Sequence, residues 1–196
     1  MNKSIALHIC CSICLVAPRE DLLLKGYQIH GVFFNPSIQP FDEYLNRLNA
    51  LKYYINTNHI TSLLSYDYDA NMHLNIAVSA DFDRKEICLK CYEIRMTYTA
   101  LNAKKNKIEN FSTTLLSSPF QDKTKIREIG AKLEKKFKIT FIDSNEWEKK
   151  HFESKKRIKD AGLYVQKYCG CIYSKMDRKA QKTWLKPLIN KSDFNR

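Results

Sequence analysis

Short apolar runs alternate with longer amphipathic runs along this chain, and that alternation is the feature that most constrains the fold. Residues 5–9 are typical of a buried strand, and residues 31–34 and 140–142 of further strands. Residues 63–68 indicate a weaker strand, and residues 111–115 a β-branched one. Apolar residues recur at helical spacing over residues 15–25, 42–56, 87–105, 122–136 and 147–159. Residues 71–83 are compatible with a short helix and a loop. Strands that alternate with helices predict a parallel sheet with right-handed crossovers.

Turn residues and chain length support a single folding unit. Gly26 is a good helix C-terminus, Asn35-Pro36 and Pro40 interrupt the second strand, and Asp42 is expected to cap the next helix. At 196 residues and 44% hydrophobic content, the chain can bury one core without disulfides. We therefore predict one α/β domain over residues 1–196, with about five parallel strands and flanking helices.

The predicted sheet places polar and sulfur-containing residues at one edge. Ligands of open parallel sheets bind beyond the carboxyl ends of the strands, near the point where strand order reverses. Cys10 and Cys11 directly follow the first strand, and Ser112-Thr113-Thr114 lies in and near the end of a later one. We expect both segments to point into that crevice.

Seven cysteines fall into three tight clusters, Cys10-Cys11-x-x-Cys14, Cys88-x-x-Cys91 and Cys169-Gly170-Cys171. No apolar run approaches the length of about 20 residues that a membrane span needs, and the apolar segment after Met1 is too short for a signal peptide. A cytoplasmic location is therefore expected. In that reducing compartment, clustered cysteines indicate metal or redox chemistry more than structural disulfides.

The clusters differ in how well they suit chelation. Cys88-x-x-Cys91 near a helix start can hold one metal or two irons of a cluster, and a helix N-terminus favours the thiolate. Adjacent side chains at a strand end diverge, so Cys10 and Cys11 can serve different metals or different corners of one. Cys169-Gly170-Cys171 is too short for easy bidentate binding; it can supply a ligand, form a redox pair or close the site.

The charge balance indicates a polyanionic partner. There are 33 Lys and Arg residues against 21 Asp and Glu, a formal +12 concentrated mostly after Lys104. The alternative is that the positive charge reflects only the amino-acid composition, since Lys, Asn and Ile are all abundant in this chain. Near the C-terminus, Tyr164, Gln166, Lys167 and Tyr168 combine stacking surfaces with hydrogen-bonding groups that suit an unstacked base or ribose, or else serve in packing.

Several common chemistries lack their motifs. The chain has no G-x-x-x-x-G-K-[ST] and no G-x-G-x-x-G, so the phosphates of ATP or a dinucleotide have no glycine-rich cradle. It has no H-x-x-x-H pair, which disfavours a histidine-based zinc hydrolase. His8, on a buried strand, is expected to hydrogen-bond near the site rather than bind a metal.

With these motifs together, the chain resembles the cobalamin-independent epoxyqueuosine reductase family, QueH. The resemblance runs in order over nearly the whole sequence. It rests on Leu7-His8-Ile9-Cys10-Cys11 with Cys14, Phe34-Asn35-Pro36 with Ile38, Pro40 and Tyr44, Cys88-x-x-Cys91-Tyr92-x-x-Arg95, Ser112-Thr113-Thr114-Leu115, Ser117-Ser118-Pro119, and Gly162-Leu163-Tyr164-x-Gln166-x-Tyr168-Cys169-Gly170-Cys171.

The resemblance implies a Rossmann-like domain similar to adenine nucleotide α-hydrolases, with cysteines in place of the nucleotide loop. It implies a [4Fe–4S] cluster beside a mononuclear iron, and a tRNA carrying epoxyqueuosine at the wobble position as substrate. The implied reaction is the last step of queuosine biosynthesis, in which the epoxide is reduced to the alkene and its oxygen leaves as water. An external electron donor protein is expected, since no flavin or nicotinamide motif is visible.

The resemblance also suggests roles for individual residues. Cys10, Cys11, Cys88 and Cys91 are the expected metal ligands, and Cys14, Cys169 and Cys171 are expected to supply the second metal or a redox pair in catalysis. Asp67 or Asp69 is a candidate oxygen ligand. The expected substrate-binding residues are Arg95, Thr113, Thr114, Tyr164, Gln166 and Tyr168, with Arg95 also able to neutralise cluster charge.

Two rival functions remain open. One is a structural zinc module that binds tRNA or another nucleic acid without redox chemistry, using four thiolates as a Cys₄ site. The seven cysteines exceed what that site needs. The other is a thiolation-type tRNA enzyme of related fold, which needs ATP, and the missing glycine-rich loop argues against it.

Overall fold

The protein is built on a five-stranded, wholly parallel sheet, seen in a computed structural model that describes residues 3–183 and side chains as far as residue 178. The strand order is β3-β2-β1-β4-β5. The strands are β1 (Lys3–His8), β2 (Tyr27–Phe33), β3 (Ser62–Ser65), β4 (Asn110–Thr113) and β5 (Thr140–Phe141). The predicted α/β class and the parallel sheet are confirmed. The predicted domain also includes residues 1–2 and 184–196, which lie outside the described residues.

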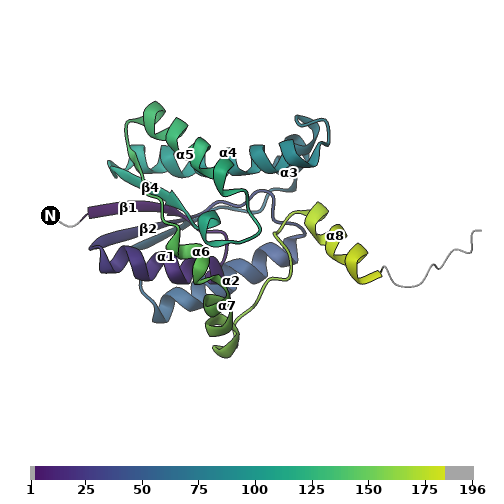
Figure 1. Ribbon diagram of the computed structural model, residues 1–196, viewed down its shortest axis with the longest axis horizontal. Coiled ribbons are helices and arrows are strands. Elements are labelled where there is room, and N and C mark those ends of the chain that lie inside the picture. Colours follow the sequence, from purple (N-terminus) through teal and green to yellow (C-terminus); the bar gives the residue numbers. More distant parts are fainter. Residues whose placement is uncertain (1–2, 184–196) are drawn as a thin grey trace, which may run out of the picture.

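Helices cover both faces of this sheet (Figure 1). Helices α3, α4 and α5 lie on one side, and α1, α2 and α7 lie on the other. The α-helices are α1 (Ser12–Leu24), α2 (Phe41–Thr57), α3 (Ala70–Val78), α4 (Arg84–Lys105), α5 (Lys123–Phe137), α6 (Glu146–Lys149), α7 (His151–Asp160) and α8 (Ile172–Thr183). Within the described range, none of the helices is long and apolar enough to cross a membrane.

The central strand β1 carries the core. From Ile5 to His8 its residues are buried, because β2 pairs with it on one side and β4 on the other. Leu7 lies opposite Gly31 of β2 and Ser112 of β4. A strand that is covered on both faces and paired at both edges must be apolar throughout, which explains the continuous run at the start of the sequence.

The chain reverses its direction of travel across the sheet between β1 and β4. Strands β1, β2 and β3 follow one another outward, and the chain then crosses through α4 to place β4 on the other side of β1. The carboxyl ends of β1 and β4 therefore meet at a topological switch point. In Figure 1 these ends point toward the side of the molecule where α8 lies.

The end of the fourth predicted strand is a correction. The predicted strand over residues 111–115 stops at Thr113, and a 3₁₀ helix, η1 (Thr114–Ser117), follows. Thr113 caps that helix, because its hydroxyl accepts the backbone N–H of Leu115 at 3.1 Å. Thr114 leaves the strand and turns toward the end of β1.

Other element boundaries also differ from the prediction. Helix α1 begins at Ser12, three residues before the predicted start. The N-cap of α2 is Pro40, and Asp42 lies in the first helical turn instead. The predicted helix over residues 147–159 is two helices, α6 and α7, which are separated at Lys150. Helix α8 had no counterpart in the prediction.

Candidate functional site

The three cysteines that follow β1 lie together in the core. Cys10, Cys11 and Cys14 are 6%, 1% and 2% exposed, and their sulfur atoms all lie within 4.8 Å of one another. Cys11 is the N-cap of α1, where its sulfur accepts the backbone N–H of Cys14 at 3.4 Å. The first turn of α1 thus brings the third thiol back to the first two. Three buried thiols at this spacing can bind a metal ion.

The protons of these thiols are unevenly distributed. Hydrogen bonds with the Cys11 and Cys14 thiols hold the pKa of Cys10 well below its ordinary value. Burial raises the pKa of Cys11 to about 12, and hydrogen bonds with Cys10 and Cys11 raise the pKa of Cys14. Of the three thiols, Cys10 is therefore the one whose pKa favours the thiolate. Thiolate is the form that binds metals.

Thr114 fixes Cys10 from the neighbouring strand end. Its hydroxyl oxygen accepts the backbone N–H of Cys10 at 3.1 Å and donates to the Cys10 sulfur at 3.4 Å. Both residues are buried. The turn from β4 into η1 is what brings the Thr114 hydroxyl to this position, so the corrected strand end is part of the site.

His8, at the end of β1, hydrogen-bonds to Thr113 at the end of β4 and to Asn35 after β2. Its Nδ1 lies 2.9 Å from Thr113 Oγ1 and its Nε2 lies 3.2 Å from Asn35 Oδ1. Because the Asn35 amide nitrogen donates to the Ile9 carbonyl at 2.9 Å, its oxygen must accept, and His8 donates from Nε2. Burial, reinforced by Arg95, lowers the pKa of His8 to about 4, so the ring is neutral.

The other four cysteines gather between α4 and the start of α8. Cys88 and Cys91 lie one turn apart on α4. Partial burial raises the pKa of Cys88 to about 11, and the nearby thiols of Cys91, Cys169 and Cys171 add to the shift. Cys171 accepts the backbone N–H of Ser174 at 3.4 Å, which repeats at α8 the arrangement found at the start of α1. The thiols of Cys91, Cys169 and Cys171 are thus electrostatic neighbours of Cys88, whereas the three thiols after β1 lie within 4.8 Å of one another.

This arrangement differs from the grouping expected from sequence. In the structure it is Cys14, rather than Cys88 or Cys91, that lies within 4.8 Å of Cys10 and Cys11. Cys169 and Cys171, which had been paired with Cys14, lie near Cys88 instead. Which thiol holds which metal stays a prediction.

A cavity of about 580 Å³ opens beside the three thiols, a size that accommodates a group such as a nucleobase. Cys10 and Cys14 contribute to its lining, and so does Cys169. The two groups of thiols therefore meet at one cavity.

Half of the predicted substrate-binding residues line this cavity. They are Arg95, Gln166 and Tyr168. The other half, Thr113, Thr114 and Tyr164, are absent from the cavity lining within the described residues. The hydroxyl of Thr113 bonds to His8, that of Thr114 to Cys10, and that of Tyr164 to Glu43.

The two candidate oxygen ligands lie elsewhere. Asp67 and Asp69 line a second cavity, of about 230 Å³, together with Phe34, Asn35 and Tyr66. That cavity includes none of the cysteines in its lining among the described residues. The structure therefore does not bring these carboxylates to the thiols.

Arg95 is a buried cation with no buried acidic partner. It is 3% exposed, and its Nε has no hydrogen-bond partner within the described part of the chain. Burial opposes its charge, but the thiols of Cys91, Cys169 and Cys10 outweigh burial and raise its pKa. The one buried carboxylate among the described residues, that of Glu43, pairs with Arg47. Burying a cation without a nearby anion costs free energy. The charge of Arg95 therefore favours thiolates over thiols among the neighbouring cysteines.

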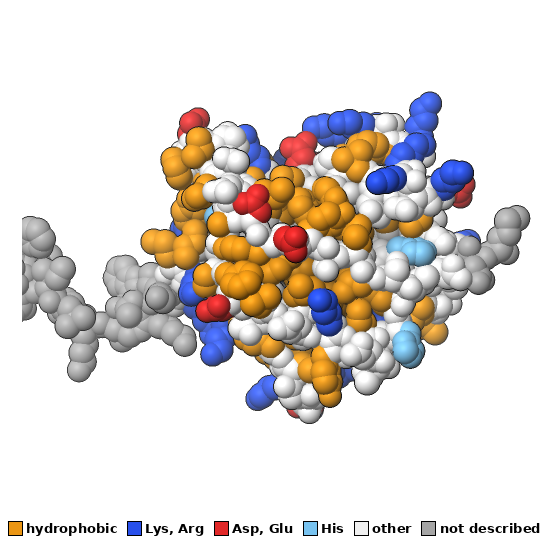
Figure 2. Space-filling view, turned by 180° about the vertical axis from the view of Figure 1, so that it is seen from behind, with side chains coloured by type: hydrophobic (Ala, Val, Ile, Leu, Met, Phe, Trp, Pro, Cys, Tyr) orange, Lys and Arg blue, Asp and Glu red, His pale blue; other side chains and the backbone are white. Residues whose placement is uncertain are grey.

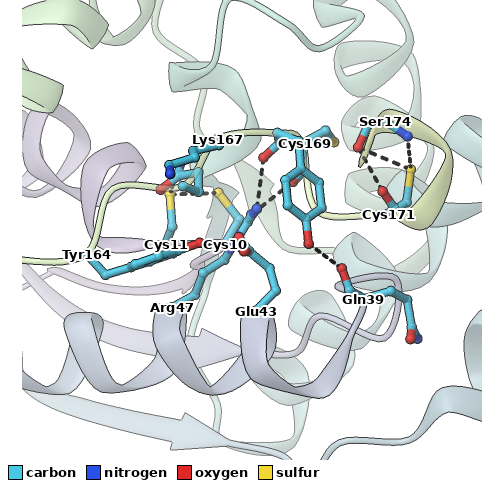
Figure 3. Close-up of polar contacts among 12 residues, drawn as sticks. Cys10, Cys11, Gln39, Glu43, Arg47, Tyr164, Lys167, Cys169, Cys171 and Ser174 are labelled. Carbon is cyan, nitrogen blue, oxygen red and sulfur yellow. Dashed lines mark hydrogen bonds and ion pairs between the residues drawn. The ribbon is translucent and has the colours of Figure 1, made fainter. Parts of the chain in front are cut away.

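An irregular segment, residues 163–171, crosses over the thiols; we call it the strap. It has neither helix nor strand. Gln166 donates from its side-chain amide to the Cys11 sulfur at 2.8 Å. The guanidinium of Arg47, from α2, donates to the carbonyls of Tyr168 and Cys169 at 2.8 Å and 2.9 Å. Figure 3 shows Arg47 reaching from α2 toward the strap beside Cys10 and Cys11.

Sequence reasoning missed two contributors to the site. Arg47 is 2% exposed and meets the strap 121 residues further along the chain. His151 lines the cavity and donates from Nδ1 to the Ser117 carbonyl at 3.0 Å, which leaves its Nε2 as an acceptor. Neither belongs to a spaced motif. Only the tertiary fold brings them to the site, so no signal in the sequence marked them.

The basic residues are unevenly spread over the surface. Figure 2 shows the face behind the view of Figure 1, where hydrophobic side chains form a broad central area and the Lys and Arg side chains lie mostly toward its margins. This face is therefore not the continuous basic surface that a polyanion needs. Lys155, Lys167 and Arg178 instead line the cavity beside the thiols.

Comparison with known proteins follows the same motifs. The model of the family described as epoxyqueuosine reductase QueH matches residues 5–177. The epoxyqueuosine reductase QueH of Thermotoga maritima is 31% identical over 186 residues, which cover 90% of this chain and 92% of that protein. The Helicobacter pylori protein of the same name is 30% identical over 89% of this chain, which spans 50% of that longer relative.

A solved structure is also similar in outline. It is described as the crystal structure of a predicted subunit of tRNA methyltransferase from Methanocaldococcus jannaschii, and it covers 82% of this chain and 89% of its own with a TM-score of 0.46 and 11% identity. A similarity at that level supports no functional inference.

Proposed function

Because the chain belongs to the epoxyqueuosine reductase QueH family, we propose that it reduces epoxyqueuosine in tRNA to queuosine. The carbon–oxygen bonds of the epoxide break, an alkene forms, and the oxygen leaves as water. Two electrons and two protons balance this change. An electron donor protein from outside the chain supplies the electrons, and the reaction takes place in the cytoplasm.

One observation carries this proposal beyond the family name. Two of the three buried thiols at the end of β1, Cys10 and Cys14, line the same cavity as the exposed Cys169, and this cavity lies at the switch point of a parallel sheet. A site for substrate is thus built directly against a site for metal. Structural metal sites are closed, whereas a catalytic one leaves a position open to substrate.

The residues present fit an iron–sulfur cluster with an adjacent iron. Seven thiols suffice for four cluster ligands and for a second metal. A cluster held by thiolates is an anion, and the buried Arg95 supplies a cation beside Cys91 and Cys169 that lacks any other counter-charge among the described residues. We propose that the ligands come from all three cysteine clusters. When bound, the cluster would pass single electrons and the second iron would act as a Lewis acid.

The protein's own side chains then bind and orient the modified base. Arg95, Gln166 and Tyr168 line the cavity and remain our proposed substrate-binding residues. Neutral His151 presents Nε2 as an acceptor, which suits a hydroxyl group of the substrate's epoxide-bearing cyclopentane ring. Burial lowers the pKa of His151, so it accepts rather than donates here.

The tRNA backbone is held at the mouth of the cavity. Lys155, Lys167 and Arg178 line the cavity, and Lys155 and Lys167 are exposed. Such cations bind phosphates through charge alone and release counterions when they do so. They lie on elements after Lys104, where the sequence concentrates its positive charge.

Anaerobic purification tests the proposal. We expect a brown protein with a broad absorption band near roughly 400 nm and about four or more irons per chain, with matching sulfide. The same sample, given a chemical reductant, should convert epoxyqueuosine in tRNA to queuosine. Cys88→Ser or Cys91→Ser should abolish both iron loading and turnover.

The structural zinc module makes the opposite forecast. A colourless protein with one zinc per chain, no sulfide and no turnover would support it and would contradict the reductase. Iron loading without turnover on the modified tRNA would also contradict the proposed activity while leaving the metal site intact.

A further inference from the structure

The strap is held in place by one side chain more than by any other. Arg47 is 2% exposed and makes three hydrogen bonds, two of them to strap carbonyls. The third joins its Nε to Glu43 Oε1 at 2.7 Å, one helical turn back on α2. A guanidinium has a planar fork of donors, so it can bind two successive carbonyls and a carboxylate at once.

Glu43 connects the same pair to the start of the strap. Its second oxygen, Oε2, accepts the hydroxyl of Tyr164 at 2.5 Å. Because Glu43 is 6% exposed, its two oxygens are committed to one arginine and one tyrosine in a buried setting. The Arg47–Glu43 pair therefore hydrogen-bonds to the strap at two places, residue 164 and residues 168–169.

The strap backbone is shaped to receive Arg47. Gly170 has φ +136°, a conformation that only glycine adopts readily. A Cβ there would lie 3.1 Å from an atom of Ile38 and 3.3 Å from Arg47 Nη1. The Gly170 carbonyl accepts the backbone N–H of Gln39 at 2.8 Å. The close approach of the strap to the guanidinium thus depends on a missing side chain.

We propose that Arg47, oriented by Glu43, is the positioning residue that fixes the strap over the three thiols. In this position the strap covers Cys11 through Gln166 and presents Cys169 and Cys171 to Cys88 and Cys91. Arg47 acts through backbone carbonyls, so its role does not depend on which thiol binds which metal. The inference adds a positioning residue to the site of the proposed function.

Thiol labelling, resolved by residue, tests the inference. The full-length chain is purified anaerobically, its metal content is measured, and a short pulse of N-ethylmaleimide is followed by peptide mass spectrometry. The labelling rate of each cysteine is divided by its rate in the same chain after unfolding and metal removal. In Arg47→Lys the charge remains but the fork is lost, and we expect this ratio to rise about tenfold for Cys11 and Cys14.

Two further variants test the contacts between the strap and the Arg47–Glu43 pair. Tyr164→Phe removes only the hydroxyl that Glu43 accepts, and we expect a smaller increase in the same ratio. Gly170→Ala places a methyl group against Arg47 and demands an unfavourable backbone conformation, so it should raise the ratio about as much as Arg47→Lys. If Arg47→Lys fails to fold, these two variants decide the question.

Matched controls separate positioning from general loss of stability. Arg157→Lys makes the same exchange in an exposed ion pair with Glu20 and should keep the wild-type ratio. Ile126→Val weakens the core in α5, away from the strap, and should also keep it. An unchanged ratio in folded Arg47→Lys, or an equal rise in Ile126→Val, would overturn the inference. Labelling requires no turnover, so the result stands whether or not the protein reduces epoxyqueuosine.

Discussion

Thr113 holds the end of β4 through two hydrogen bonds of its hydroxyl group. It was predicted to bind substrate, but it is fully buried and its hydroxyl joins His8 Nδ1 to the N–H of Leu115. Thr113→Val removes both bonds and leaves a buried imidazole nitrogen unpaired. We expect the free energy of unfolding to fall by about 1–3 kcal/mol, measured by urea denaturation of the reduced protein. Thr113→Ser keeps the hydroxyl and should be less destabilised than Thr113→Val; equal destabilisation would contradict this account.

Arg95 leads to a prediction whose sign depends on bound metal. In metal-free protein its buried charge has no carboxylate partner among the described residues, so Arg95→Met should leave stability unchanged or raise it by about 1–3 kcal/mol. In the loaded protein the same change removes the counter-charge of the thiolates and should lower iron retention against a chelator. Urea denaturation and iron release measure the two effects. Stabilisation of both forms would show that Arg95 does not balance the site.

At the scale of elements, Gly130 allows α5 to pack closely against Phe141 of β5. A Cβ at Gly130 would lie 2.4 Å from the ring of Phe141. Alanine favours helices by about 1 kcal/mol over glycine, but overpacking costs about 1–3 kcal/mol. We therefore expect Gly130→Ala to lower the thermal midpoint despite its better helix propensity. Ala131→Gly is the matched exchange at an exposed position and should show only the propensity loss; a stabilised Gly130→Ala protein would contradict the packing argument.

The elements also show why sequence reasoning succeeded in some places and failed in others. Strand β1 lies in the core, and burial on both faces leaves a continuous apolar run from Ile5 to Leu7 that is visible in the sequence. Thr114 is β-branched and was assigned to a strand, but its hydroxyl binds Cys10, a residue 104 positions away along the chain. Helix α8 was missed although its apolar and polar residues segregate to two sides at helical spacing.

The site itself was predictable only in part. The rule that ligands meet at a switch point placed Cys10 and Cys11 beyond the carboxyl end of the first strand, and the structure has a cavity beside these residues. The approach of Cys169 and Cys171 to Cys88 was not accessible, because it depends on the path of the strap. Arg47 and His151 were equally hidden, since an arginine in a helix or a lone histidine has no local signature of burial.

At the scale of the whole molecule, the distribution of charge leads to a prediction about tRNA binding. Lys155 and Lys167 line the cavity at the carboxyl edge of the sheet, whereas Lys105 ends α4 at the opposite edge, before β4 begins. Lys155→Glu should weaken tRNA binding and reduce the slope of log affinity against log salt by about one unit for each phosphate group that the variant no longer neutralises.

Lys105→Glu makes the same charge change and should alter binding far less, because the Debye length at physiological salt is only about 8 Å. Filter binding at four or more salt concentrations, with unmodified and epoxyqueuosine-containing tRNA, measures both slopes. Equal weakening in the two variants would mean that affinity follows net charge rather than place, and the cavity mouth would then not be the tRNA surface. Weakening that is confined to Lys155→Glu and similar for both tRNAs would locate phosphate binding there and leave recognition of the modified base to the cavity interior.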